Sequence, residues 1–281
     1  MAHSIQRCAL ALGAFTPELA SKSSNALSPP LFRCSLLPVG GVMPLKLIRG
    51  SVVGVTLSIF LFVLSPQVEA TNRSARDLVV VVNLTESGRS DLKWLYKFMD
   101  ASALSLAQLT LGTQYRQIHA LVGQDATSGN FVSTLRETSE DRALEAIDVF
   151  LHLHGNADGV RFADDHIAAA QLGDQLAVLP ERRKLRVLYS SACYGASHAP
   201  RLVQDGFAVA SGAIATNANS AFEYPYFLAA WAGGYTFGEA IELGNDPLQN
   251  RILDAAAEWQ GFTDVNSTKI IVGNHNRTLE Y

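Results

Sequence analysis

Between residues 77 and 272, short apolar runs alternate with stretches whose apolar residues recur at helical spacing. The runs are rich in Val, Ile and Leu and end in polar residues, which is typical of strands buried on both faces. Strands are predicted at 77–84, 115–122, 148–153, 185–191, 207–210 and 269–272, and helices at 90–106, 139–147, 200–205, 221–232, 236–244 and 247–259. The more polar segment 154–184 is expected to hold a hairpin or excursion. This alternation predicts an α/β fold, a three-layer α/β/α sandwich around a mostly parallel sheet.

The first 70 residues do not follow this alternation. Residues 51–64 form an apolar, uncharged run of 14 residues, whereas a membrane-spanning helix needs about 20. Basic residues precede the run and Val68-Glu69-Ala70 follows it, which is the pattern of a secretory signal peptide starting at Met43. We therefore expect residues 1–70 to be an N-terminal extension with a signal peptide, and residues 71–281 to form one exported domain. The alternative is an uncleaved membrane anchor at 51–66.

Composition narrows the possible partners. The chain has 281 residues, of which 48% are hydrophobic, and a formal net charge of −4, so global disorder is excluded and nucleic acid is not an expected partner. The one dense basic run, 182–184, is predicted to be an exposed turn. Removal of residues 1–70 would take away Cys8 and Cys34, leave Cys193 alone, and move the net charge to −7. A single thiol in an exported protein is either a buried apolar residue or a working thiol.

Two predicted strands end in reactive side chains. One reads VFLHLHG (149–155) and ends at His154, and the other reads RVLYSSACYG (186–195) and leads to Cys193. In parallel sheets the chemistry lies at the carboxyl ends of the strands, so neighbouring strands would bring the two side chains together. An imidazole can take the proton of a thiol that attacks a carbonyl. The backbone N–H groups of Gly155 and Cys193 are candidates for an oxyanion hole.

These two motifs, in the order His then Cys, resemble the caspase-like cysteine peptidases, the group that includes caspases, metacaspases, legumains and gingipains. The resemblance covers roughly residues 77–244 and also takes in Gly234-Tyr-Thr-Phe-Gly-Glu-Ala240. It implies a caspase-like sheet, His154 as the general base and Cys193 as the nucleophile. It also implies that 207–216 leads into the primary specificity pocket, and that the partner is a peptide or protein substrate.

The resemblance has limits. Ser191 stands where caspases proper have Gln, and basic residues that would bind an aspartate side chain are not assignable, so caspase specificity for Asp does not carry over. We expect Ser211, Gly212, Glu223 and Asp158 to bind substrate. Acidic residues in the 156–184 and 211–224 segments favour a basic residue before the scissile bond; they are Asp158, Asp164, Asp165, Asp174 and Glu223.

Three alternatives remain open at this stage. His152 and His154 share a strand face and could bind a metal with His166 or Asp158, but a complete ligand set is missing, so we expect neither a metal nor another cofactor. Ser197 could be the nucleophile of a serine esterase, with His275 and either Asp254 or Asp264. The fold could also be a binding or scaffold module without turnover. Stable membrane insertion is not expected if the signal peptide is cleaved.

Overall fold

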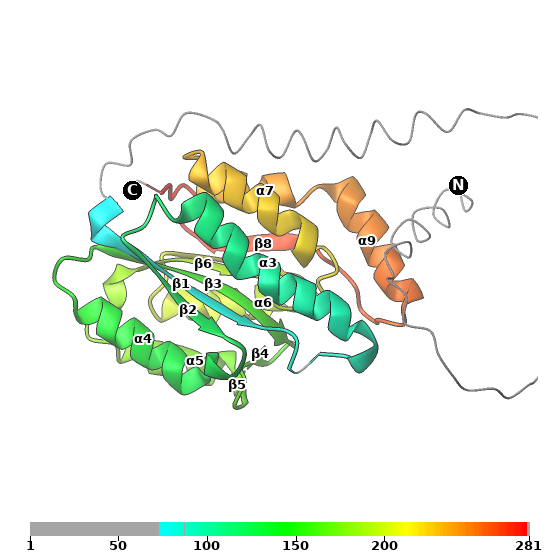
Figure 1. Cartoon of the computed structure of the whole chain (residues 1–281), viewed down its shortest axis with the longest axis horizontal. Helices are drawn as coiled ribbons and strands as arrows, with labels where there is room; N and C mark the ends of the chain where they lie inside the picture. Colours follow the sequence, from blue (N-terminus) through cyan, green and yellow to red (C-terminus); the bar gives the residue numbers. More distant parts are fainter. Residues whose placement is uncertain (1–72, 87, 280–281) are drawn as a thin grey trace, which may run out of the picture. The chain divides into compact units, whose positions relative to one another are not determined.

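The protein is described here by a computed structural model that covers residues 73–86 and 88–279 (Figure 1). The expected signal peptide at 43–70 and the alternative anchor at 51–66 lie outside these residues. Within the described ranges, no helix has both the length and the apolar character needed to cross a membrane.

The core of the fold is a mostly parallel sheet with the strand order β2-β1-β3-β6-β7-β8. Neighbouring strands on this path run parallel, except that β8 is antiparallel to β7. A short antiparallel hairpin, β4–β5, extends from the end of β3. The bounds are β1 (Arg76–Asn83), β2 (Gln117–Val122), β3 (Ala146–Gly155), β4 (Gly159–Arg161), β5 (His166–Ala168), β6 (Leu185–Ser190), β7 (Val209–Ala213) and β8 (Lys269–Gly273). The predicted α/β fold is confirmed.

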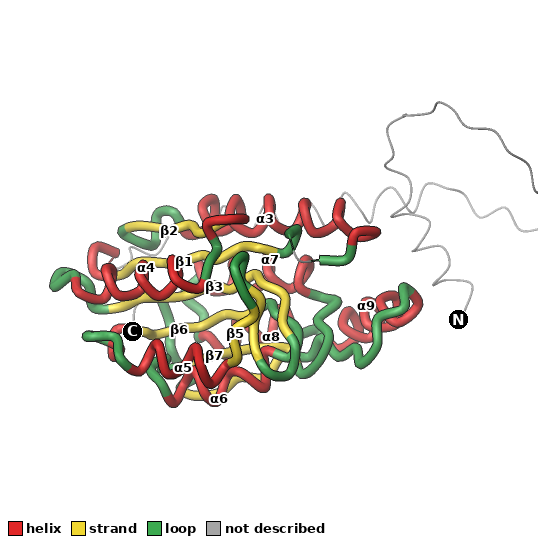
Figure 2. The backbone as a smooth tube through the Cα atoms, turned by 90° about the horizontal axis from the view of Figure 1, so that it is seen from below, coloured by secondary structure: helices red, strands yellow, loops and turns green. Residues whose placement is uncertain are grey.

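Helices cover both faces of this sheet (Figure 2). One apolar layer joins the sheet to α4 (Ser128–Glu140), α5 (Ala169–Ala177) and α6 (Gly195–Gln204). The other layer joins it to α3 (Lys93–Leu111), α7 (Ser220–Ala232) and α8 (Phe237–Gly244). Strand β1 supplies both layers, because Val79 and Val81 face one while Val80 and Val82 face the other. Within the described residues, the other helices are α9 (Pro247–Trp259) and the short 3₁₀ helices η1 (Arg73–Ala75), η2 (Ser90–Leu92), η3 (Gly123–Asp125) and η4 (Arg182–Lys184).

The predicted helix at 139–147 is wrong. Helix α4 ends at Glu140, and β3 already begins at Ala146. The helix starts earlier because Thr127 caps it, its side chain accepting a hydrogen bond from Asn130 N at 3.0 Å. Its buried face has few apolar side chains, so hydrophobic spacing alone did not reveal it.

Segment 154–184 holds the expected hairpin and, in addition, helix α5, which was not predicted. The basic run at 182–184 forms η4, in which Arg182 and Arg183 are exposed as expected. Other elements differ in their bounds. Helix α6 begins at Gly195, two residues after Cys193, rather than at residue 200, and β7 covers 209–213 rather than 207–210.

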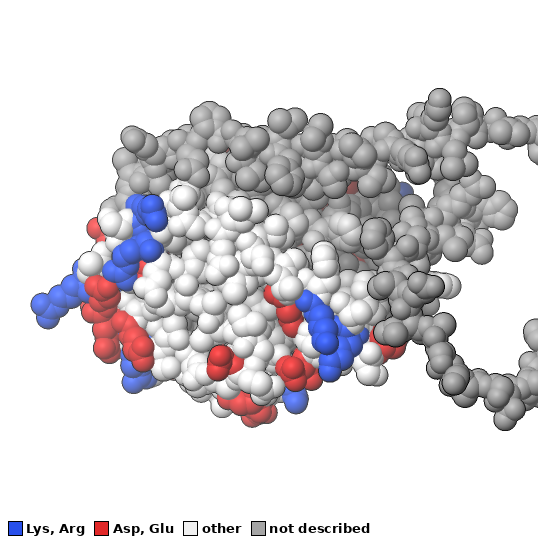
Figure 3. Space-filling model, in the orientation of Figure 1, with Lys and Arg blue, Asp and Glu red and all other residues white. Residues whose placement is uncertain are grey.

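Figure 3 shows the charged side chains on one face of the described part. Where this face is not covered by grey atoms, blue and red side chains lie near its visible margin and much of the middle is uncharged. The visible area shows no continuous basic region.

Candidate active site

The carboxyl ends of β3 and β6 lie side by side, as the sequence predicts. The two strands are parallel neighbours, with Leu151 opposite Ser190. Beyond that pair the main chains touch, since a Cβ added at Gly155 would lie 2.5 Å from the carbonyl oxygen of Cys193 and 3.1 Å from Cβ of Ala192. Only glycine fits this contact. The structure thus brings His154, Gly155 and Cys193 to one edge of the sheet.

A tight turn presents Cys193 at the sheet edge. Tyr194, the next residue, has φ 56° in the left-handed region, which residues other than glycine rarely adopt. The turn is held from two sides, because Tyr194 N donates to Ala215 O at 2.8 Å and its hydroxyl donates to Asp264 Oδ2 at 2.6 Å. Backbone strain of this kind is concentrated at functional sites. The turn also starts α6, so the partly exposed thiol lies between β6 and that helix.

The imidazole of His154 is oriented by the main chain after β1. Its Nε2 lies 2.8 Å from the carbonyl oxygen of Leu84. A carbonyl only accepts, so Nε2 carries the hydrogen and Nδ1 of the neutral ring is left as an acceptor. The carboxylate of Asp100 on α3 fixes this segment by accepting from Leu84 N and from Thr85 N, each at 2.9 Å. Asp100 therefore supports the group that orients the imidazole.

Burial keeps His154 neutral. The ring of Tyr96 meets the imidazole edge-on, with 4.9 Å between centroids and an interplanar angle of 88°. Burial lowers the pKa of His154, while the Leu84 carbonyl and the charge of Asp100 act in the opposite direction. A ring of this kind is ready to accept a proton at neutral pH.

The thiol of Cys193 is also in its neutral form. Burial raises the pKa of Cys193, and three weaker effects oppose this: the N–H of Asn217, the N–H of Cys193 itself and the positive charge of Lys269. The N–H of Asn217 lies 3.4 Å from Sγ. Because both groups are neutral, attack by the sulfur requires proton transfer to a base rather than a preformed ion pair.

Ser211 and Gly212 do not reach the surface of this site. Both are buried in β7. Gly212 packs against the first residue of α6, because a Cβ there would lie 2.4 Å from Cα of Gly195. Gly212 allows the close approach of β7 and α6, and the expected role of the two residues in substrate binding stays a prediction.

Glu223 is likewise buried rather than open to a substrate. Its Oε1 lies 2.9 Å from Nζ of Lys269, and both side chains are 2% exposed. The carboxylate of Glu223 is therefore paired inside the protein, and its expected contact with substrate stays a prediction. Asp158 differs, because it is exposed in the turn that follows Gly155 and joins β3 to β4.

The serine alternative has no supporting geometry. The hydroxyl of Ser197 lies 2.7 Å from Ala157 O and 2.8 Å from Tyr194 O, so it donates to main-chain carbonyls instead of to a base. His275 follows β8, whose end pairs with the beginning of β7, so it lies at the opposite edge of the sheet. Ser197 and His275 are thus not brought together.

His152 and His154 do share a strand face, as predicted, but His152 is buried. Burial and the charge of Lys269 lower the pKa of His152 to about 3, and its Nδ1 lies 3.2 Å from Oγ of Ser191. Among residues 73–86 and 88–279, no group of three or more His, Cys, Asp or Glu side chains is placed to hold a metal ion.

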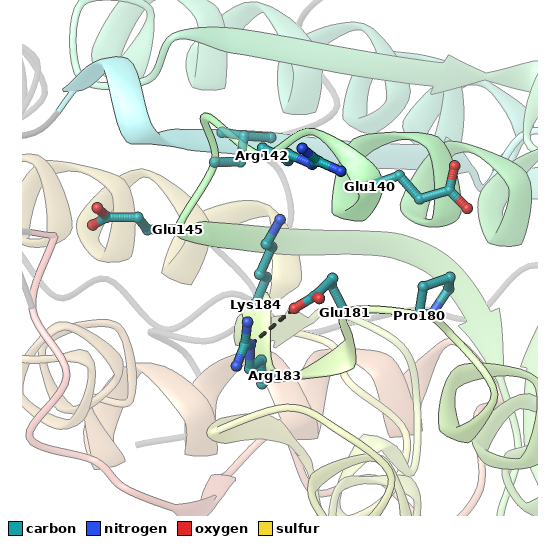
Figure 4. Close-up of a pocket in the computed structure, with 8 residues that line it drawn as sticks. Glu140, Arg142, Glu145, Pro180, Glu181, Arg183 and Lys184 are labelled. Carbon is teal, nitrogen blue, oxygen red and sulfur yellow. Dashed lines mark ion pairs between the residues drawn. The ribbon is translucent and has the colours of Figure 1, made fainter.

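A surface pocket of about 600 Å³ lies at the other end of β3 and β6 (Figure 4). It is lined by charged side chains that precede these strands, and Arg183 pairs with Glu181 at 2.8 Å. Because His154 and Cys193 follow the carboxyl ends of the same strands, this pocket is not part of the candidate active site.

Two residues of the site, Asn217 and Lys269, were not found from the sequence. Asn217 follows β7 at the same sheet edge, so its position after a buried strand was an available signal. Lys269 gave no such signal, because a lysine at the start of a C-terminal strand resembles a solvated residue.

No protein-family model matches the chain, and no curated protein shows significant similarity to it.

Proposed function

We propose that the protein is an exported cysteine endopeptidase that hydrolyses peptide bonds through His154 and Cys193. The observation that carries the proposal is the contact between the two strand ends, with Gly155 against Cys193 and the imidazole of His154 held through Nε2. Export rests on the sequence pattern of residues 43–70.

The reaction begins with the neutral pair. Nδ1 of His154 takes the proton from Cys193 while Sγ attacks the peptide carbonyl carbon. The oxyanion that forms is stabilised by backbone N–H groups, for which Gly155, Cys193 and Asn217 are the candidates around the sulfur. The protonated imidazole then gives its proton to the leaving amine, which departs and leaves a thioester. His154 next takes a proton from water, the hydroxide attacks the thioester, and Cys193 regains its proton.

The proposal is tested on the purified full-length protein with a library of fluorogenic peptides and a peptide-like thiol-reactive electrophile. Cys193→Ala is expected to abolish turnover, and His154→Ala to lower it by about 10²–10⁴. Ser197→Ala is the matched control and should retain turnover, because its hydroxyl only donates to main-chain carbonyls. Loss of activity in Ser197→Ala alone would refute the cysteine mechanism. Absence of labelling at Cys193 across pH 5–8, together with absence of turnover, would favour the binding-module alternative.

A further inference from the structure

A fully buried ion pair lies beneath the candidate nucleophile. Lys269 is the first residue of β8 and Glu223 is on α7, and their charged groups are 2.9 Å apart with both side chains 2% exposed. Burial of two charges has a desolvation cost that their attraction often fails to recover, so such a pair is weak evidence for stability. Its position relative to Cys193 suggests a different role.

The pair holds the strand end that carries Cys193. Nζ of Lys269 donates to the carbonyl oxygen of Ser190. The side-chain amide of Asn217 donates to the next carbonyl, that of Ser191, and to Oε1 of Glu223, each at 3.2 Å. One hydrogen-bond network therefore fixes two successive carbonyls, those of Ser190 and Ser191, shortly before Cys193.

The same network reaches the sulfur. Because its side chain is anchored on Glu223, Asn217 presents its backbone N–H to Sγ of Cys193 at 3.4 Å. The hydroxyl of Tyr189 also donates to Oε1 of the Glu223 carboxylate at 3.0 Å, so Lys269, Asn217 and Tyr189 all meet at this oxygen. Lys269 is the cation whose field favours the ionised form of Cys193.

We propose that Lys269 and Glu223 are a positioning pair for Cys193: with Asn217 they fix the exit of β6, and the ammonium of Lys269 stabilises negative charge as it develops on Sγ. The role assigned to this charge in peptide hydrolysis rests on the proposed function. The effect on thiol reactivity does not, because alkylation requires ionisation of the same sulfur.

Other titratable groups surround the thiol and must be kept constant in a test. They are His154 on β3, Tyr96 on α3, Tyr194 in the turn and Lys269 on β8, with His152 and Glu223 in the layer beneath. Substitution of Lys269 alone leaves all the others in place.

The experiment measures the rate of iodoacetamide alkylation of Cys193 in the full-length protein as a function of pH, read by mass spectrometry of the peptide that contains Cys193. In Lys269→Met the midpoint of the profile should move to higher pH, and the rate at pH 7 should fall about tenfold. Lys269→Arg should recover most of the rate.

The matched control is Lys184→Met. Lys184 precedes β6, and its ammonium donates to Ser139 O at 2.6 Å and to Asp141 O at 2.8 Å. The same substitution here therefore removes hydrogen bonds to main-chain carbonyls and one positive charge, but at the opposite end of β6. Its profile should match that of the wild type. If Lys269→Met also matches the wild type, or if Lys184→Met shifts equally, the inference is wrong.

Lys269→Met leaves the buried carboxylate of Glu223 without its cation, and this variant could fail to fold. A second variant therefore keeps the inference testable. Lys269→Met/Glu223→Gln removes both charges and should fold, as checked by circular dichroism, with its alkylation profile shifted in the same direction. A folded double variant with a wild-type profile would overturn the inference. A wild-type protein that alkylates in a Lys269-dependent manner yet hydrolyses no peptide would refute the proposed function and leave this inference standing.

Discussion

The carbonyl oxygen of Leu84 lies 2.8 Å from Nε2 of His154 and thereby selects the tautomer of the imidazole. The carbonyl cannot donate, so the hydrogen on the ring is fixed at Nε2 and the free lone pair at Nδ1. The position of Leu84 depends in turn on the carboxylate of Asp100. The orientation of the base is thus set by a main-chain segment and a helix from another part of the chain.

Asp100→Ala is expected to lower the reactivity of Cys193 by about tenfold or more, because the 84–85 segment loses both hydrogen bonds and the imidazole loses its fixed orientation. The acid limb of the pH–rate profile should also move to lower pH, since the charge of Asp100 raises the pKa of His154. Alkylation rates measured across pH provide both values.

Asp164→Ala is a suitable control for Asp100→Ala. Its carboxylate accepts from Ser128 N at 2.9 Å and from Ser128 Oγ at 3.0 Å at the surface, away from Cys193. This variant should keep the wild-type rate and profile. A folded Asp100→Ala protein with unchanged rate and unchanged acid limb would contradict the positioning role of Asp100.

Gly155→Ala should disrupt the contact between the strand ends. The added methyl group would lie 2.5 Å from the carbonyl oxygen of Cys193, a main-chain atom that can move only with its strand. We expect a loss of about 1–3 kcal/mol in the free energy of unfolding and a larger proportional loss of thiol reactivity. Urea denaturation and alkylation rates measure the two effects separately.

Gly129→Ala tests whether this effect is specific to the contact. A Cβ at Gly129, in α4, meets no atom within 4 Å, so alanine should be neutral or stabilise the helix by up to about 1 kcal/mol. Equal losses of stability and reactivity in the two glycine variants would show that the contact at Gly155 has no special role.

Stability should fall as the pH is lowered below about 6.5, in part because of His152. Its pKa is lowered from 6.5 to about 3, so the unfolded chain takes up a proton at a pH at which the folded protein does not. In this window each pH unit costs about 1.4 kcal/mol for one such group. Between pH 6.5 and 5, His152→Phe should therefore lose about 2 kcal/mol less than the wild type, as measured by urea denaturation.

The exposed His275 provides the corresponding control. His275→Gln removes an exposed histidine and leaves the buried His152 in place, so the loss of stability in acid that His152 causes should persist. If His152→Phe also retains the full dependence, burial of His152 does not contribute to the loss of stability in acid.

The sheet and its reactive edge could be predicted from the sequence because each depends on a local pattern. Apolar runs such as DLVVVVNL predict a buried strand. Two such runs end near His154 and Cys193, which predicted that these strand ends lie side by side. Helix α4 was missed because its mean hydropathy is low and its buried face includes Thr138 and Ser139. The N-cap residue Thr127 was a signal for the start of this helix, but the spacing of apolar residues does not include it.

The interior of the site could not be predicted because it depends on contacts between distant residues. Glu223 was expected to face substrate, since acidic residues are usually solvated, and Lys269 was not singled out at all. The two form an ion pair with each other, between α7 and β8. Nothing in the neighbouring sequence of either residue indicates that partner.

The antiparallel strand β8, which carries Lys269, is the last described strand of the site to be synthesised. During synthesis His154 and Cys193 leave the ribosome before Lys269 does, and only the pairing of β8 with β7 brings the ammonium to the carbonyl oxygen of Ser190 at the end of β6. A nascent chain that ends before β8 therefore carries both reactive side chains while the cation that supports the thiolate is still missing. The sulfur should gain its full reactivity only after the last described strand has docked, which would limit premature chemistry on the unfinished polypeptide.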